Sequence, residues 1–197
     1  MTATKQPKVQ LGPQTLLYPM PAVLVGVNVQ GKPNFMTAAW SGIACSVPPM
    51  LTVAIRGKDR FTRDGITPQG TFSINVPRAD QAAWVDYLGI VSGRNEDKTT
   101  RAGIDVFFDE PSNTPMIAQC PLCLVCRVAH ILTLGSHDLV VGEIVQTHID
   151  EDCVENGKPL VEKLNPLVYA TGASTYHSIG PVVAKAFHAG LALRKQQ

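Results

Sequence analysis

Apolar, often β-branched runs recur along the chain, separated by short polar segments or segments containing Gly and Pro. Such runs are typical of strands, and the turn residues between them mark the strand ends. The pattern predicts strands at residues 22–29, 34–41, 50–56, 71–76, 122–134 and 139–149, with a short one at 167–170. Most neighbouring strands are joined by turns too short for a parallel crossover. The chain is therefore expected to be mainly β, an antiparallel barrel.

Helical spacing is confined to a few segments. Residues 78–91 carry apolar side chains at helical spacing before the stop signal Ser92-Gly93, and 61–66 and 95–102 read as short helical turns. Residues 181–194 predict a terminal amphipathic helix whose apolar side holds Val182, Val183, Ala186 and Leu193. No G-x-G-x-x-G follows a strand, which argues against a Rossmann fold. We expect one domain over residues 1–197, with its core at about 15–180 and two or three peripheral helices.

Composition narrows the classes of protein. The 197 residues include 17 Lys and Arg and 16 Asp and Glu, and charged residues make up only 17% of the chain. Disordered chains are poor in apolar groups and rich in charge, whereas this chain is 45% hydrophobic. A formal net charge of +1 provides no general basic field for a nucleic-acid backbone, so a nucleic-acid binder is disfavoured.

Two long stretches almost lack charge. Lys32 is the only charged residue between positions 9 and 55, and residues 164–184 have none. Prolines and glycines break the first stretch into pieces far shorter than the roughly 18 to 20 apolar residues of a membrane span. A homodimer would cover such surfaces instead, because obligate interfaces resemble a core cut in half. Residues 1–13 show no secretory or transit pattern, so a cytoplasmic protein is expected.

The chain has five cysteines, an odd number that fits a reducing compartment: Cys45, Cys120, Cys123, Cys126 and Cys153. The spacing of Cys120, Cys123 and Cys126 is that of an iron–sulfur or zinc run. However, residues 122–134 predict a strand, so Cys123 is expected to point away from Cys120 and Cys126. We favour structural thiols, with a metal or cluster as the alternative.

Candidate chemistry lies in two nearby segments. Residues 34–49 combine small side chains, hydroxyls and Trp40, which allows a flat ring to approach the backbone closely, although the segment also reads as plain strand and loop. Residues 56–62 bring cations and a hydroxyl to a loop at the start of a helical turn, where an anion is favoured. Together they suit an isoalloxazine ring and a phosphate.

Five ordered motifs resemble a known family. They are N-x-M-T-A-x-W with P-P (Asn34 to Pro49), R-x-T (Arg60, Thr62), D-K (Asp97, Lys98), P-L-x-L-x-C (Pro121 to Cys126) and G-S-H-D-L-V-V-G-E (Gly135 to Glu143). This set is similar to the flavin reductase-like FMN-binding split barrels, and in particular to their flavoredoxin branch. The resemblance covers residues 15–180 and implies an antiparallel split barrel that holds FMN non-covalently at a homodimer interface.

The resemblance also implies site residues. Asn34, Met36, Thr37, Ala38 and Trp40 would line the flavin ring or ribityl chain, with Cys45 and Ser46 beside its reactive edge. Arg60, Thr62 and Lys98 would receive the phosphate. His137, expected in a turn, would close over the cofactor or the nicotinamide, and Tyr169 would supply an aromatic wall. No general base or catalytic side chain is assigned, because the cofactor carries the chemistry, and Cys45 is expected to pack against the ring.

The implied function is an FMN-dependent oxidoreductase that takes electrons from NADH or NADPH and passes them to a small acceptor or redox protein. The alternative is a flavoredoxin-like electron carrier with little NAD(P)H activity. A cofactor-free structural dimer is a third, non-redox possibility. Residue patterns do not separate the first two, because this fold has no nicotinamide signature.

Overall fold

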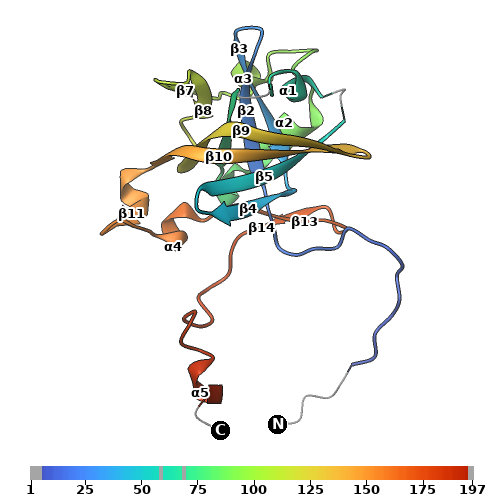
Figure 1. The fold of residues 1–197 in the computed structure, drawn as a ribbon, viewed down its shortest axis with the longest axis vertical. Coiled ribbons are helices and arrows are strands. Elements are labelled where there is room, and N and C mark those ends of the chain that lie inside the picture. The colour runs from blue at the N-terminus through green and yellow to red at the C-terminus, as the bar shows by residue number, and fades with distance from the viewer. Residues whose placement is uncertain (1–5, 58–59, 68–69, 195–197) are drawn as a thin grey trace.

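The computed structural model describes residues 6–57, 60–67 and 70–194, and its centre is a seven-stranded antiparallel sheet (Figure 1). The strands are β2 (Val23–Val29), β3 (Lys32–Ala38), β4 (Ser41–Ser46), β5 (Pro49–Arg56), β6 (Thr71–Val76), β9 (Leu122–Leu134) and β10 (His137–Ile149). Their order across the sheet is β3-β2-β6-β9-β10-β5-β4. The predicted strands at 71–76 and 122–134 match β6 and β9 at both ends.

The sheet is rolled. Strands β3 and β4 form its two opposite edges, yet only residues 39 and 40 connect them in the chain. A link of this length spans at most about 11 Å, so the edges must lie close together without pairing. The expected antiparallel split barrel is confirmed. The predicted strand at 34–41 is corrected, because β3 ends at Ala38 and a separate strand, β4, begins at Ser41.

Strand β6, near the middle of the sheet, is buried on both faces. In β6, Phe72 and Ile74 belong to the apolar cluster inside the barrel, while Ser73 and Asn75 face the other side. These two buried polar groups have partners: the Ser73 hydroxyl donates to the carbonyl of Pro115 at 2.6 Å, and the Asn75 carboxamide accepts from the Ile117 amide at 2.9 Å. They tie a second hairpin to the outer face.

Shorter elements surround the barrel. The hairpin is β7 (Val106–Asp109) with β8 (Thr114–Ile117), and a three-stranded sheet joins β1 (Met20–Pro21), β13 (Val168–Ala170) and β14 (Thr175–His177). Strands β11 (Val154–Glu155) and β12 (Lys158–Pro159) pair with each other, and 3₁₀ turns cover Ala79–Gln81 and Glu151–Cys153. The helices are α1 (Phe61–Asp64), α2 (Ala82–Ile90), α3 (Lys98–Arg101), α4 (Val161–Leu164) and α5 (Leu191–Arg194). Thus the helix predicted at 78–91 and both short helical turns are confirmed.

The predicted C-terminal helix at 181–194 is wrong over most of its length. Only α5 is helical, and residues 181–190 form an irregular arm in which Val183 is 95% and Phe187 97% exposed. Short helices take most of their stability from packing an apolar face, and this segment packs on nothing within its own chain. The apolar side of the predicted helix therefore has no surface in this chain to pack against.

Two arms leave the body of the molecule. Residues 6–19 precede β1 and residues 178–194 follow β14, and both run away from the barrel (Figure 1). They expose apolar side chains: Val9, Leu11, Leu16, Leu17, Ile179, Val182, Val183, Phe187, Leu191 and Leu193. Among the described residues, no helix is both long and apolar enough to cross a bilayer.

The cysteines are free thiols. Cys123 and Cys126 lie in β9 and belong to the clusters on opposite faces of the sheet, as predicted. Cys120 is a correction: it precedes the strand, escapes its alternation and packs in the same cluster as Cys123. Burial raises the pKa of Cys123 and of Cys126 to about 12, so both are neutral at physiological pH.

Candidate functional site

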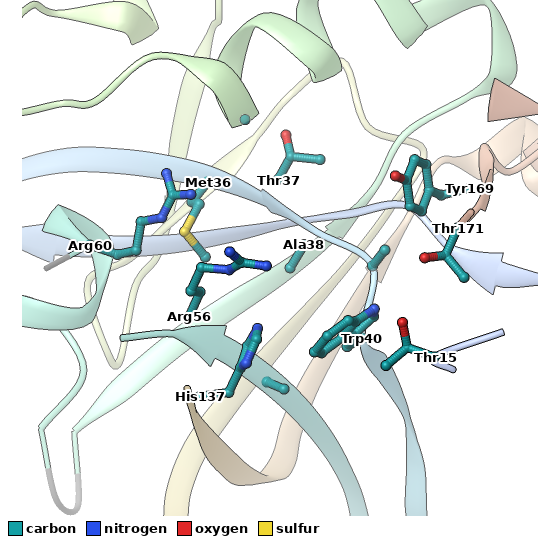
Figure 2. Close-up of a pocket in the computed structure, with 13 residues that line it drawn as sticks. Thr15, Met36, Thr37, Ala38, Trp40, Arg56, Arg60, His137, Tyr169 and Thr171 are labelled. Atoms are coloured by element: carbon teal, nitrogen blue, oxygen red, sulfur yellow. The ribbon is translucent and has the colours of Figure 1, made fainter. Parts of the chain in front are cut away.

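A pocket of about 390 Å³ lies at the seam between β3 and β5 (Figure 2). The connection of residues 39 and 40 enters it, the end of α2 and the start of β13 close one side, and the junction of β5 with β10 closes the other. Its lining is Thr15, Met36, Thr37, Ala38, Ala39, Trp40, Ala54, Arg56, Arg60, Gly89, His137, Tyr169 and Thr171. These residues include two arginines and no carboxylate, so the pocket favours an anion.

The cationic end continues into a small cavity of about 10 Å³ that shares Met36 and Arg60 with the main pocket. Thr62 and Lys98, both predicted to meet a phosphate, line this cavity. Thus Lys98, which lies far along the sequence from Arg60 and Thr62, converges with them as the sequence predicts. Their binding of a ligand stays a prediction.

Local structure explains how Lys98 reaches this place. The Asp97 carboxylate caps α3, accepting from the backbone amide and the hydroxyl of Thr100 at 3.1 and 2.8 Å. The Lys98 side chain is 3% exposed and turns back to the end of α2, where its ammonium donates to the carbonyls of Leu88 (2.7 Å) and Val91 (2.9 Å). An ammonium has three protons, so one remains for another acceptor.

Burial lowers the pKa of Lys98 to about 8, and the nearby positive charge of Arg60 adds to this effect. The group is still mainly protonated at pH 7. The described residues that line the main pocket and the small cavity include no carboxylate, so an anion that binds between Arg60 and Lys98 stabilises both cations. On its other side Lys98 borders a larger hollow that also contains Glu96, Asp97 and Asp105.

Asn34 holds Thr62 in position at the cationic end of the pocket. It is buried, and its side-chain amide donates to the Thr62 hydroxyl at 2.7 Å. A Cβ atom on Gly93 would lie 2.2 Å from the Asn34 amide oxygen, so only glycine fits there. Asn34 does not line the main pocket. It faces a larger hollow of about 730 Å³ whose lining includes Glu96, Asp97 and Asp105, and these carboxylates disfavour a phosphate there.

The other end of the pocket is built from small and aromatic groups. Figure 2 shows Trp40 and Tyr169 on either side of the opening beyond Ala38. The Trp40 and His137 rings lie 4.4 Å apart, centre to centre, at 33°. His137 is the first residue of β10 and not, as predicted, part of the turn, which consists of Gly135 and Ser136.

His137 is held as a neutral ring. Its Nδ1 atom lies 2.8 Å from the Ser136 hydroxyl oxygen, within hydrogen-bond distance. Burial, and then the positive charge of Arg56, lower the pKa of His137 below its ordinary value. Because that ordinary value is about 6.5, the ring is largely uncharged at neutral pH.

Thr37 sits at the floor between the two ends. Its hydroxyl donates to the Val85 carbonyl of α2 at 2.5 Å. Gly89, one turn later in the helix, approaches so closely that a Cβ atom there would lie 3.1 Å from the Thr37 Cβ. The hydroxyl and the small residue together bring α2 against β3, which positions the carbonyls that Lys98 binds.

Besides Asn34, two more predicted residues lie outside the pocket. Cys45 and Ser46 are on β4, beyond the point where the chain leaves the pocket at Trp40, and do not line it. The Cys45 thiol donates to the Val47 carbonyl at 3.4 Å, and Ser46 is exposed. The roles assigned to these two residues need a surface that a single chain does not provide.

Sequence reasoning missed several lining residues. Arg56 belongs to the cationic segment 56–62 but lies outside its R-x-T motif, and its position at a strand end next to a turn is the signal that marks it. Thr15 and Thr171 come from loops without any motif, and nothing in their sequence surroundings marks them. The sequence gives no sign that Gly89 lines a pocket, because a glycine near the end of a predicted helix usually indicates only where the helix stops.

One other group of side chains has the composition of a metal site. Ligand atoms of Asp150, Asp152 and Cys153 lie within 4.8 Å of one another. However, the Arg78 guanidinium already donates to the Asp150 carboxylate at 3.1 Å and to the Cys153 thiol at 3.5 Å. A cation already occupies this position, so the group does not support a metal centre.

The fold and the site define a split-barrel protein with a pocket that has cationic side chains at one end and small and aromatic side chains at the other. Residues 15–179 match the family model described as flavin reductase like domain, and the chain belongs to this family. The match and the structural neighbours place it in the flavoredoxin branch, among proteins of flavin-related redox function.

Two solved flavoredoxins are similar to the chain. That of Methanosarcina acetivorans has a TM-score of 0.89 and 34% identity, covering 95% of this chain and 100% of the other. That of Desulfovibrio vulgaris (Miyazaki F) has a TM-score of 0.87 and 37% identity, covering 93% and 99%. An NADH-dependent FAD reductase of Streptomyces globisporus is 26% identical over 133 residues, 64% of this chain and 68% of that protein. The chain spans 59% of the length of a relative from Aeropyrum pernix, to which it is 29% identical over 157 residues.

Proposed function

We propose that the protein is an FMN-dependent oxidoreductase that passes electrons from a reduced nicotinamide to a small acceptor or a redox partner. The observation that carries this proposal is the pocket itself. It combines cations at one end with small and aromatic side chains at the other, and the described residues that line it include no carboxylate. A flat aromatic ring on a flexible chain that ends in a phosphate matches both ends.

The donor set fits FMN. Arg60, Thr62 and Lys98 would hold the phosphate, and charge-assisted hydrogen bonds contribute about 1.5 to 3 kcal/mol each. These bonds would supply about half of the roughly 8 kcal/mol that micromolar binding requires, and the ring contacts would supply the rest. The cationic end closes in a cavity of about 10 Å³, which has room for about one water molecule, so a terminal phosphate would lie at its mouth and the longer tail of FAD could not continue through it.

Bound FMN would supply the two-electron chemistry. The chain's own groups bind and orient: cations fix the tail, Ala38 and Ala39 permit close approach to the backbone, and Trp40 and Tyr169 shield the opening from water. His137 is neutral at neutral pH, so it can donate or accept a hydrogen bond without adding charge. No general acid or base is assigned.

A second copy of the chain completes the proposal. The exposed arms and the β4 edge carry apolar side chains, among them Ile43 at 71% exposure, in the stretches that lack charge. A homodimer buries such surfaces. It would also bring Cys45 and Ser46 beside a cofactor, because β4 of one protomer would then face the pocket of its partner. Five free thiols fit a cytoplasmic location.

A titration of the purified protein with flavins tests the cofactor. We expect FMN to bind at micromolar or lower concentration, more tightly than FAD and much more tightly than riboflavin, which lacks the phosphate. Equal affinity for FMN and riboflavin would contradict the phosphate site. Failure of all three flavins to bind would leave only the third possibility, a cofactor-free dimer.

The electron carrier remains the second candidate, favoured by the likeness to two flavoredoxins. Anaerobic mixing of the FMN-loaded protein with NADH or NADPH separates the two. Rapid loss of the oxidised flavin absorbance supports the oxidoreductase. Absorbance that persists with both donors, yet disappears with a reduced redox protein, supports the carrier.

A further inference from the structure

The arginines whose side chains the structure describes fall into two groups. Most have a carboxylate partner: Arg63 with Asp138, Arg78 with Asp150, Arg94 with Asp64, Arg101 with Glu96 and Arg127 with Glu143, at 2.6 to 3.7 Å. Arg56 and Arg60 have none among the described residues, and both line the main pocket. An arginine aimed into a pocket without a counter-ion is available for a ligand.

The two unpaired arginines occupy different positions. Arg60 belongs to the cationic end, where it shares the small cavity with Lys98. Arg56 ends β5, opposite His137 in the ladder with β10. Figure 2 shows its guanidinium turned into the pocket, between Arg60 and the stacked pair of Trp40 and His137.

A charge balance leaves Arg56 in excess. A phosphate monoester carries at most two negative charges at pH 7. Arg60 and Lys98 together already provide two positive charges at the cavity assigned to the phosphate. Among the described residues that line the main pocket, no carboxylate balances the third cation. The pocket is therefore built for more negative charge than one flavin monophosphate brings.

We propose that Arg56 binds a phosphate group of a second ligand, a nicotinamide dinucleotide, at the rim of the flavin pocket. This proposal rests on the proposed function and adds the residue that recognises the electron donor. The planar fork of an arginine matches two phosphate oxygens at once. His137 beside it has a lowered pKa, so the neutral ring can accept or donate a hydrogen bond there without competing for the anion.

The test measures binding rather than turnover. Isothermal titration of the FMN-loaded protein with the oxidised dinucleotides NAD⁺ and NADP⁺ gives both affinities without reaction. We expect Arg56→Gln to weaken dinucleotide binding about ten- to a hundredfold, from the range for charge-assisted hydrogen bonds, and to change FMN affinity less than threefold. Arg56→Lys keeps the charge and loses the planar fork, so its affinity for the dinucleotides should lie between those of the wild type and Arg56→Gln. Equal losses for both dinucleotides indicate the shared diphosphate, and a loss for NADP⁺ alone indicates its 2′-phosphate.

Arg127→Gln is the matched control, because Arg127 lies on β9 with its own partner Glu143 and should leave both affinities unchanged. If Arg56→Gln lowers FMN affinity as much as Arg60→Gln does, Arg56 belongs to the cofactor phosphate site and the proposal is overturned. It is also overturned if the FMN-loaded wild type binds neither dinucleotide, or if Arg56→Gln binds both as well as the wild type. Failure of the wild type to bind FMN would instead overturn the proposed function.

Discussion

The two ends of the pocket are built in different ways. The cationic end is complete within one chain: Asn34 holds Thr62, and Lys98 is fixed by two carbonyls of α2. The aromatic end lies at the seam of the barrel, where the chain passes from β3 to β4 and the exposed β4 edge begins. One end is thus preorganised, and the other is bordered by surfaces that a single chain leaves in water.

This difference suggests a division of labour. Lys98 is buried and hydrogen-bonded, and it provides a rigid anchor whose geometry does not depend on a partner, whereas Arg60 at the same end is exposed. An end built from Trp40, His137 and Tyr169 at an open seam can admit a second molecule and can be completed by a second copy. Changes at the seam should therefore affect assembly and access, whereas changes at the anchor should affect the affinity for the phosphate.

The largest effect is expected from Ile43→Asp on β4. If the exposed β4 edge forms the homodimer interface, a carboxylate there is buried without a partner in both copies, which weakens association by more than about a hundredfold. Light scattering after size-exclusion chromatography measures the change from dimer to monomer. Val161→Asp on α4 is the control, because Val161 is comparably apolar and exposed but lies outside the uncharged stretches. A dimer that survives Ile43→Asp would remove β4 from the interface.

Lys98→Ala tests the cationic end of the pocket, the anchor proposed for the phosphate. We expect FMN affinity to fall about ten- to a hundredfold, because one charge-assisted hydrogen bond is lost. Fluorescence titration with FMN measures this, and riboflavin affinity should change little because it lacks the phosphate. Lys158→Ala, which removes an exposed lysine from β12, should leave both affinities unchanged. Unaltered FMN affinity in Lys98→Ala would exclude Lys98 from the site.

The residues of the anchor could be predicted from the sequence because they lie in local motifs. R-x-T marks Arg60 and Thr62, and D-K marks a helix start whose Asp97 caps and whose Lys98 turns inward. The strands were equally accessible, since alternation and turn residues act over short distances. In both cases the signal and the structure that it predicts lie within a few residues of each other.

The seam was harder to predict for a physical reason. Nothing local shows that residues 39 and 40 join opposite edges of a rolled sheet, so Ala38 and Ser41 were assigned to one strand. The C-terminal arm failed similarly: its amphipathic pattern is real, but a helix needs a surface to pack on, and the chain itself provides none. Cys120 was misplaced because alternation was extended past the end of β9.

The pH dependence of FMN affinity also tests the role of Lys98 at the cationic end. The pKa of Lys98 in the flavin-free protein is about 8, and a bound phosphate would raise it. A phosphate monoester is already dianionic above pH 7, so its own charge stays constant. FMN affinity should therefore be flat below pH 8 and then fall by up to about tenfold per unit, because binding must take up the proton that Lys98 has lost. Fluorescence titrations from pH 7 to 9 measure this, and Lys98→Arg, which stays charged, should abolish the dependence.

The smallest effect is expected at the aromatic end, from Trp40→Leu. A flavin ring packed against the Trp40 indole would gain about 0.5 to 1.5 kcal/mol beyond its buried area, as other aromatic pairs do. Removing the indole should therefore weaken FMN and riboflavin alike by about three- to tenfold, because the lost contact is with the ring and not with the phosphate. Trp84→Phe leaves Trp40 as the only tryptophan, so quenching of its fluorescence by added flavin reports contact directly. A loss for FMN alone, or no quenching in Trp84→Phe, would show that the two ends of the pocket do not hold the two ends of one molecule.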